Sequence, residues 1–187
     1  MADETNTIAI DGDFDDANDY LYRRGMTDGL PVVPPTAERV DQMLTGTSRD
    51  PDEELGTIPP KYGIATVEKL ATNAVMAGCE PEYMPVLIAA VEAMTRDEFN
   101  LYGVNATTHP VAPLVVVNGP IVDELKLNYG YNVFGQGWRA NATIGRAVRL
   151  LLVNVGGGEP GEMDRATHGH PGKYSFCIAE NEGRNPW

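Results

Sequence analysis

One segment, EPEYMPVLIAAVEAM at residues 80–94, restricts the fold of this chain more than any other. It is apolar on most sides of a helix, which predicts a buried helix at the centre of a packed domain. Pro81 stands where such a helix would begin, and Pro85 falls in its first turn, where the missing N–H costs little. The remaining elements are therefore expected to pack around this helix.

A strand and a second long helix are also well marked. PLVVV at residues 113–117 precedes the turn residues NGP, and its continuous branched side chains predict a strand buried on both faces. ATIGRAVRLLLVNV at 142–155 predicts a helix capped by Asn141 and ended by three glycines. KYSFCI at 173–178 predicts the last strand. Shorter helices are expected at 18–24, 36–44 and 66–77.

Helices outnumber strands in this pattern, which predicts an α+β or small α/β layered domain, helix-rich and with a short mixed sheet. A length of 187 residues fits one domain better than two. Residues 1–16 have many acidic side chains and almost no apolar periodicity, so they predict a flexible acidic tail. The expected organisation is a tail followed by a single globular domain at 17–187, forming half of a composite assembly.

The charge distribution excludes several classes of partner. The net charge is −13, and residues 1–60 carry 14 acidic but only 4 basic side chains. Without a Lys/Arg cluster the chain lacks the basic surface that nucleic acids require. No apolar run is long enough for a membrane helix, and the acidic start lacks the features of a secretory signal. We expect a cytoplasmic protein whose cysteines stay as thiols.

The strongest candidate for a binding motif is FGQGWRANAT at residues 134–143. Gly135 and Gly137 free the backbone, and Arg139 provides a planar cation beside the N-terminus of the predicted helix. With Asn132 and Asn141, this segment predicts a site for a carboxylate or phosphate. The alternative is structural: the glycines form a turn, the tryptophan packs, and the arginine caps a carbonyl.

A second candidate precedes the predicted strand, in GVNATTHPVAP at residues 103–113. Loops beside buried strands often direct polar groups into a pocket, and His109 titrates near neutral pH. We expect His109 to act as an acid or base, with Asn105, Thr107 and Thr108 binding substrate or orienting the ring. The alternative is a histidine held by a tight turn, with the threonines in local hydrogen bonds.

His168 and His170 lie in the Gly-flanked loop THGHPG, and together with His109 they are all the histidines of the chain. Three imidazoles are a known ligand set for zinc, which makes a metal site an alternative hypothesis. Alternate residues in an irregular loop need not converge, so a solvated turn is the default interpretation. We therefore predict no metal, and the sequence indicates no particular cofactor.

Two cysteines and two glutamates complete the set of candidate catalytic groups. Cys79 lies between the end of one predicted helix and the start of the next, which push a thiol pKa in opposite directions. Cys177 alternates with apolar residues and is expected to be a small buried side chain. Glu180 and Glu182 follow the last strand, a frequent position for site residues, although they also fit a solvated end.

Several long phrases together carry a resemblance to a known group of proteins. These are GLPVVPPT, ATVEKLATNAVMAGCEPEYMPV, NATTHPVAPLVVVNGPI, YNVFGQGWRANATIGRAVRLLLVNVGG and PGKYSFCIAENE, spanning residues 18–187. With them the chain resembles bacterial proteins associated with the UGSC-type thiol/selenol family and matches their N-terminal part. The resemblance implies a redox or bond-cleaving system that works with a separate domain bearing cysteine or selenocysteine.

The resemblance also implies that similar proteins continue well beyond the point that matches ENEGRNPW. The C-terminal residues are therefore expected to form an interface, with Trp187 as an anchor, and to share a site with another subunit. Our first hypothesis is an enzyme subunit, redox or lyase-like, that acts on a small polar or anionic substrate in an oligomer. The alternatives are a non-catalytic scaffold subunit and a hydrolase dependent on a histidine-bound metal.

Overall fold

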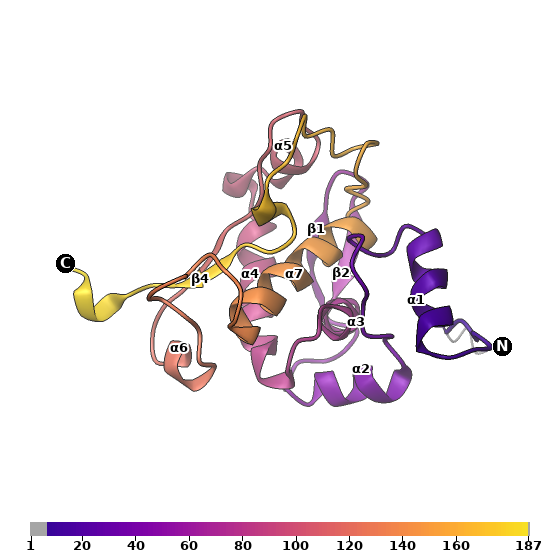
Figure 1. The fold of residues 1–187 in the computed structure, drawn as a ribbon, viewed down its shortest axis with the longest axis horizontal. Helices are drawn as coiled ribbons and strands as arrows, with labels where there is room; N and C mark the ends of the chain where they lie inside the picture. The colour runs from indigo at the N-terminus through magenta and orange to yellow at the C-terminus, as the bar shows by residue number, and fades with distance from the viewer. Residues whose placement is uncertain (1–6, 187) are drawn as a thin grey trace.

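The structure is a computed structural model that describes residues 7–186. Its core is formed by two helices that pack against each other, α3 (Val67–Ala77) and α7 (Arg139–Asn154). Helices α2 (Ala37–Leu44) and α4 (Met84–Met94) cover this pair, and α1 (Phe14–Arg23) lies at the end of the molecule opposite to the C-terminal segment (Figure 1). The helix-rich α+β class predicted from the sequence is confirmed.

The remaining elements are short. Two small helices are α5 (Leu101–Asn105) and α6 (Ile121–Glu124). Single 3₁₀ turns occur at Pro81–Tyr83, Asp97–Phe99, Pro171–Lys173 and Glu182–Arg184. None of the helices in residues 7–186 has both the length and the apolar character needed to cross a membrane.

The strands form two separate two-stranded sheets among the described residues, whereas we expected one mixed sheet. β1 (Glu54–Ile58) and β2 (Gly63–Thr66) pair antiparallel, in a segment for which we predicted no strand. β3 (Val115–Val117) and β4 (Cys177–Ala179) pair parallel, with Val116 opposite Ile178. The two parallel strands are joined through α6 and α7, so the sheet depends on contacts between distant segments.

Helix α3 shows how local sequence sets the element boundaries. The Thr66 hydroxyl accepts a hydrogen bond from the Lys69 N–H at 3.2 Å, which satisfies one free donor of the first turn. At the other end Gly78 takes a left-handed conformation with φ of 88°, which only glycine adopts without strain. The helix predicted at 66–77 is therefore confirmed, and Gly78 ends it.

Other expectations about the elements were also wrong. The acidic start becomes helical earlier than predicted, because Asp13 caps α1 by accepting the N–H groups of Asp15 and Asp16. Residues 1–6 of the predicted tail lie outside the described residues. Helix α7 begins at Arg139 and Asn141 lies inside it, so Asn141 is no N-cap. β3 is not buried on both faces, because Val116 is 52% exposed.

Helix α4 also differs from its predicted place at the centre of the domain. Its residues Met84, Leu87 and Val91 are fully buried, but Pro85, Ala89 and Ala93 are exposed. The centre belongs instead to α3 and α7, which make the most extensive contacts of any two elements. A largely apolar helix with small residues on one side can therefore lie at the surface of this domain.

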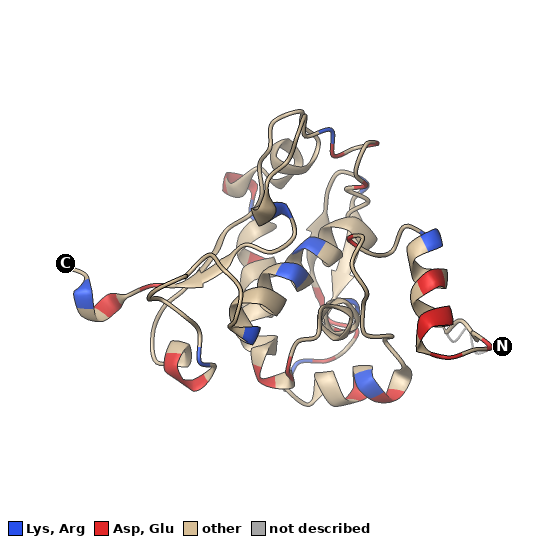
Figure 2. Ribbon diagram, viewed as in Figure 1, with Lys and Arg blue, Asp and Glu red and all other residues tan. Residues whose placement is uncertain are grey.

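Charge is unevenly distributed over the helices (Figure 2). Acidic residues mark α1 and α6, whereas α7 contains three arginines and no acidic residue. Arg146 of α7 is half of a partly buried bidentate ion pair, because its Nε and Nη2 atoms lie 2.8 and 2.9 Å from the carboxylate oxygens of Asp28. This pair ties the loop before α2 to the central helix.

Candidate functional site

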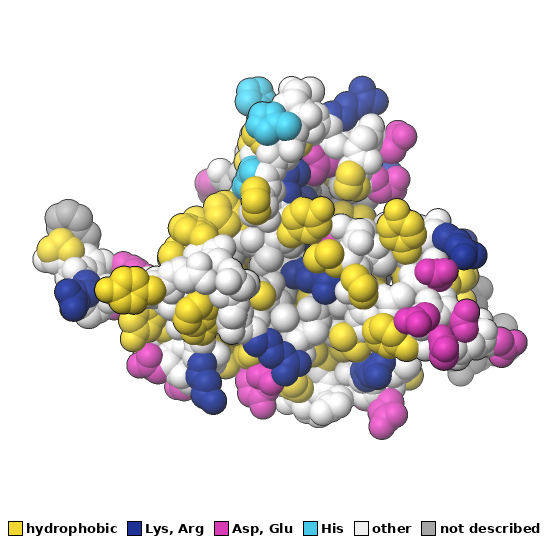
Figure 3. All heavy atoms as spheres, viewed as in Figure 1, with side chains coloured by type: hydrophobic (Ala, Val, Ile, Leu, Met, Phe, Trp, Pro, Cys, Tyr) yellow, Lys and Arg dark blue, Asp and Glu magenta, His cyan; other side chains and the backbone are white. Residues whose placement is uncertain are grey.

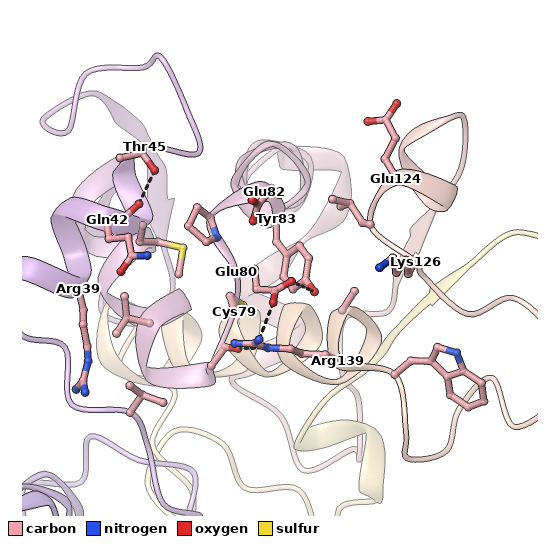
Figure 4. Close-up of a pocket in the computed structure, with 18 of the residues that line it drawn as sticks. Arg39, Gln42, Thr45, Cys79, Glu80, Glu82, Tyr83, Glu124, Lys126 and Arg139 are labelled. Atoms are coloured by element: carbon pink, nitrogen blue, oxygen red, sulfur yellow. Dashed lines mark hydrogen bonds and ion pairs between the residues drawn. The ribbon is translucent and has the colours of Figure 1, made fainter.

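A cavity of about 1070 Å³ opens between α2, the 78–83 segment, α6 and the start of α7 (Figure 4). The chain reaches it four times, through Arg39 of α2, through Cys79 and Glu80, through Lys126, and through Arg139. Because these segments are distant in sequence, the packing of α3 against both α2 and α7 creates the cavity. Its size lies at the upper end of the range of pockets that bind small molecules.

Three side chains on the cavity wall form a hydrogen-bonded network. Arg139 Nη1 donates to Glu80 Oε1 at 2.6 Å, and Arg139 Nε donates to the Gly78 carbonyl at 3.1 Å. The Tyr83 hydroxyl donates to the other carboxylate oxygen of Glu80 at 2.9 Å. Burial, with help from Glu80, raises the pKa of Tyr83 to about 12, so the hydroxyl keeps its proton at neutral pH. The network holds the Arg139 guanidinium in one orientation.

Arg139 keeps binding capacity in this arrangement. Its Nη2 group makes no hydrogen bond with the described residues, and the Arg139–Glu80 pair is about half exposed. Arg139 is also the first residue of α7, and no described side chain caps that helix, so the N–H groups of the first turn remain available. A polar or anionic group in the cavity therefore has both a cation and backbone donors within the same wall.

The charges around the cavity are balanced. Arg39 and Lys126 lie on opposite sides of the Arg139–Glu80 pair, and Glu82 and Glu124 contribute the remaining acidic groups (Figure 4). Three cations therefore face three carboxylates. This balance favours a small molecule that carries both donors and acceptors over a polyanion such as a nucleic acid.

The two thiols are buried and protonated. Cys79 lines the cavity but is only 7% exposed, and burial raises its pKa to about 12 although Thr143 and Arg139 act in the opposite direction. Burial likewise raises the pKa of Cys177 to about 12. Since the thiolate is the nucleophile, neither cysteine is activated in this conformation. The structure places Cys79 beside Arg139 on the cavity wall, and burial decides between the two opposing effects of the helix ends in favour of the protonated thiol.

The asparagines and glycines of the predicted binding motif have structural roles. Asn141 is buried, accepts the Asn128 N–H at 2.8 Å, and donates to the carbonyls of Asn128 and Cys177 at 3.0 and 3.3 Å. Asn132 closes its own loop by donating to the Gln136 carbonyl at 2.9 Å, and the Gly135 N–H donates to the Asn132 carbonyl. Of this motif, Gly137, Trp138, Arg139 and Ala140 line the cavity.

The predicted histidine site lies elsewhere, at the apex formed by α5 and the loops beside it (Figure 3). His109 is exposed and its Nδ1 lies 3.2 Å from the Thr107 hydroxyl, as in the local turn that we considered as the alternative. The carbonyls of Thr107 and Thr108 accept from the N–H groups of Arg165 and Thr167. Asn105 is buried and donates to the Pro59 carbonyl at 3.0 Å, a structural contact.

The histidines also do not form a metal centre. His170 accepts the Gly172 N–H at 3.1 Å and contacts the ring of Phe176, while His168 Nδ1 lies 3.3 Å from the Thr167 hydroxyl. Within residues 7–186 no group of three or more His, Cys, Asp or Glu side chains is placed to hold a metal ion. The hypothesis of a histidine-bound metal therefore has no support in the geometry.

Glu180 and Glu182 belong to a third location, at the C-terminal end of the parallel sheet. Glu180 accepts from the side chains of Asn118 and Asn185 at 3.2 and 2.7 Å, and Glu182 accepts the Gly119 N–H at 2.7 Å. They hold the turn after β3 and do not line the cavity. Trp187, the predicted interface anchor, lies outside the described residues.

Sequence reasoning therefore missed most of the cavity. Glu80 and Tyr83 follow Cys79 directly, and their spacing across one 3₁₀ turn was a local signal that could have identified them. Arg39 and Lys126 carried no such signal, because only the packing of α2 and α6 near α7 brings them to the cavity.

We found no protein-family model that matches this chain. Neither a curated protein nor a solved structure is significantly similar to it.

Proposed function

We propose that this chain is the substrate-binding subunit of a bacterial enzyme, and that a small polar or anionic substrate occupies the cavity between α2 and α6. The observation that carries the proposal is the Glu80–Tyr83–Arg139 network, which holds a guanidinium on the wall of a cavity and beside an uncapped helix N-terminus. Such an arrangement can bind a carboxylate through a charge-assisted hydrogen bond.

The chemistry would be redox or bond-cleaving and would take place at a site shared with a partner. Two points support this assignment. The chain resembles proteins associated with the UGSC-type thiol/selenol family, and both of its own thiols have pKa values raised to about 12 by burial. A reactive thiolate or selenolate would therefore come from the partner, while this chain positions the substrate. We place the system in the cytoplasm, where buried free thiols such as Cys79 and Cys177 persist.

A panel of amino acids and small mono- and dicarboxylic acids tests the proposal. Thermal-shift screening should identify at least one ligand, and isothermal titration calorimetry should then give its affinity. We expect Arg139→Gln to weaken binding by about tenfold or more, because one charge-assisted hydrogen bond is lost.

Arg23→Gln is the matched control, because Arg23 pairs only with Asp19 on the exposed surface of α1. It removes the same charge from the protein and should leave the affinity unchanged. Equal binding by the two variants, or no ligand in the panel, would contradict the assignment of the cavity.

One observation favours a second candidate, the non-catalytic scaffold. In the described residues, the thiols are protonated, the histidines lie away from the cavity, and Glu80 is engaged with Arg139 and Tyr83. If a scaffold is correct, no substitution in the cavity would change the turnover of a reconstituted complex. The substrate-binding proposal requires that Arg139→Gln lower that turnover at limiting substrate.

A further inference from the structure

The two edges of the small parallel sheet differ. On β4 the outer edge is covered, because the Ala179 N–H donates to the Asn128 carbonyl at 3.2 Å and the Cys177 carbonyl accepts from the Asn141 side chain. On β3 the bonds to the neighbouring strand involve Val115 and Val117: the Val115 N–H donates to the Phe176 carbonyl, and the Val117 carbonyl accepts from the Glu180 N–H. Because bonding alternates along a parallel strand, Val116 directs its N–H and C=O away from β4.

Nothing in residues 7–186 pairs with that free edge. The sheet contains only β3 and β4, and no described group bonds to the Val116 backbone. The side chains of Val116 and Leu114 are 52% and 41% exposed. An open edge with exposed branched side chains is a surface on which another strand can pair, and proteins normally protect such edges.

An apolar groove of about 580 Å³ runs along this edge, between β3 and α4. The exposed residues of α4 that line it are Pro85, Ala89 and Ala93, whose small side chains leave room for a second backbone. No charged residue lines the groove, although 22% of the chain is charged. On a protein with net charge −13, an uncharged apolar surface of this kind is expected to be covered by a binding partner.

We propose that the β3 edge is the interface between two copies of this chain, which pair their β3 strands antiparallel about a two-fold axis at Val116. In this arrangement Val116 of each copy exchanges both backbone hydrogen bonds with Val116 of the other. The absence of charge in the groove matters here, because a two-fold axis brings identical side chains of the two copies together. A charged residue at the axis would be repelled by the same residue of the other copy.

The pairing also leaves no open edge. The resulting sheet has the order β4-β3-β3-β4, and its outer edges are the β4 edges already covered by Asn128 and Asn141. The assembly therefore stops at two copies. It does not depend on the proposed function, because the groove and the Arg139 cavity share no lining residue.

Sedimentation velocity of the full chain over a range of concentrations from about 1 to 200 µM tests the proposal, since homodimers of modest interface area dissociate in this range. We expect a reversible monomer–dimer equilibrium. Raising the salt concentration should strengthen the dimer, because each copy carries a net charge of −13 and salt screens the repulsion between the two copies.

Val116→Lys should raise the dissociation constant by at least about tenfold, because lysine on an edge strand opposes pairing. Ile64→Lys is the matched control, since Ile64 is a branched strand residue, 41% exposed, in the separate β1–β2 hairpin. It should leave the dissociation constant unchanged. Circular dichroism of both variants verifies that they fold.

Amide hydrogen exchange of the wild-type protein provides a measurement that needs no variant. Exchange of residues 113–118 should slow at concentrations that favour the dimer. A monomer at every concentration overturns the proposal, whether the edge then serves another polypeptide or none. A dimer that Val116→Lys leaves intact, or one without protection at 113–118, overturns it as well.

Discussion

Arg139 and Arg149 lie ten residues apart on the same helix, α7, and yet they occupy opposite kinds of environment. Arg139 is 57% exposed at its side chain and pairs with Glu80 beside an open cavity. The side chain of Arg149 is 9% exposed and lies 3.8 Å from Asp164, which Lys173 approaches more closely, at 2.8 Å. Burial lowers the pKa of Arg149, while Asp164 raises it.

The difference separates a charge that is available for binding from one that is enclosed by the fold. An exposed ion pair contributes little to stability, because water already solvates both groups. A buried cation has lost that solvation and depends on its carboxylate partner. We therefore expect substitutions near Arg139 to act on ligand binding and substitutions near Arg149 to act on folding.

The largest expected effect is that of Asp164→Ala, which tests the buried side of the comparison. The substitution leaves Arg149 and Lys173 without the Asp164 carboxylate that they share. The free energy of unfolding should therefore fall by about 3–5 kcal/mol. Urea denaturation followed by circular dichroism measures the change. A loss below about 1 kcal/mol would mean that water solvates this cluster as well as it does an exposed pair.

A smaller effect concerns pH and tests whether the α7 arginines activate the neighbouring thiol. Arg139 and Arg146 lower the pKa of Cys79, but burial dominates and raises it from 9.0 to about 12. The unfolded thiol thus ionises first, so this contribution to stability is complete below pH 9 and is lost as the pH rises toward 12. The expected slope is about 1.4 kcal/mol per pH unit for each buried cysteine.

Denaturation at pH 9, 10 and 11 measures this slope, with Cys79→Ala and Cys177→Ala as the comparison. Each variant should have a shallower decline than the wild type, because one shifted thiol is absent. If the decline were the same in all three proteins, the thiols would not be enclosed as the structure indicates.

The smallest effect should be that of Arg139→Gln on stability. The Arg139–Glu80 pair is about half exposed, so screening by water limits the loss in unfolding free energy to less than about 1 kcal/mol. The same variant is expected to lose ligand affinity. Measuring both stability and affinity therefore shows whether Arg139 acts in binding or in folding. A large loss of stability would place Arg139 with Arg149, as a structural residue, and would remove the distinction between them.

The sequence predicted the elements whose signals are local. Thr66 and Gly78 mark both ends of α3, and the apolar run after Pro81 marks α4. It failed for the β1–β2 hairpin, because the short strands lack an alternating apolar pattern, and we predicted no strand there. The exposure of Val116 was missed because three consecutive valines look the same whether or not a further strand covers them.

For the candidate site, the sequence singled out Arg139 and Cys79, and both line the same cavity. It could not determine that His109, Glu180 and Asn141 lie apart from them. The residue type determines which chemistry a side chain can perform, but the distance between two side chains depends on how distant segments of the chain pack together. Asn141 shows the limit: it was selected as a polar ligand, and the fold uses it to fasten the 128 segment to β4.

The sequence by itself determined the helix-rich α+β class, most helix positions and the candidate status of Arg139, because caps, glycines and apolar periodicity act within a few residues. Only the tertiary structure decided that Glu80, Tyr83 and Arg139 form one network and that Cys79 is enclosed and protonated. It also decided which edge of the parallel sheet is covered. These properties arise from desolvation and from contacts between residues far apart in the chain, which no local pattern records.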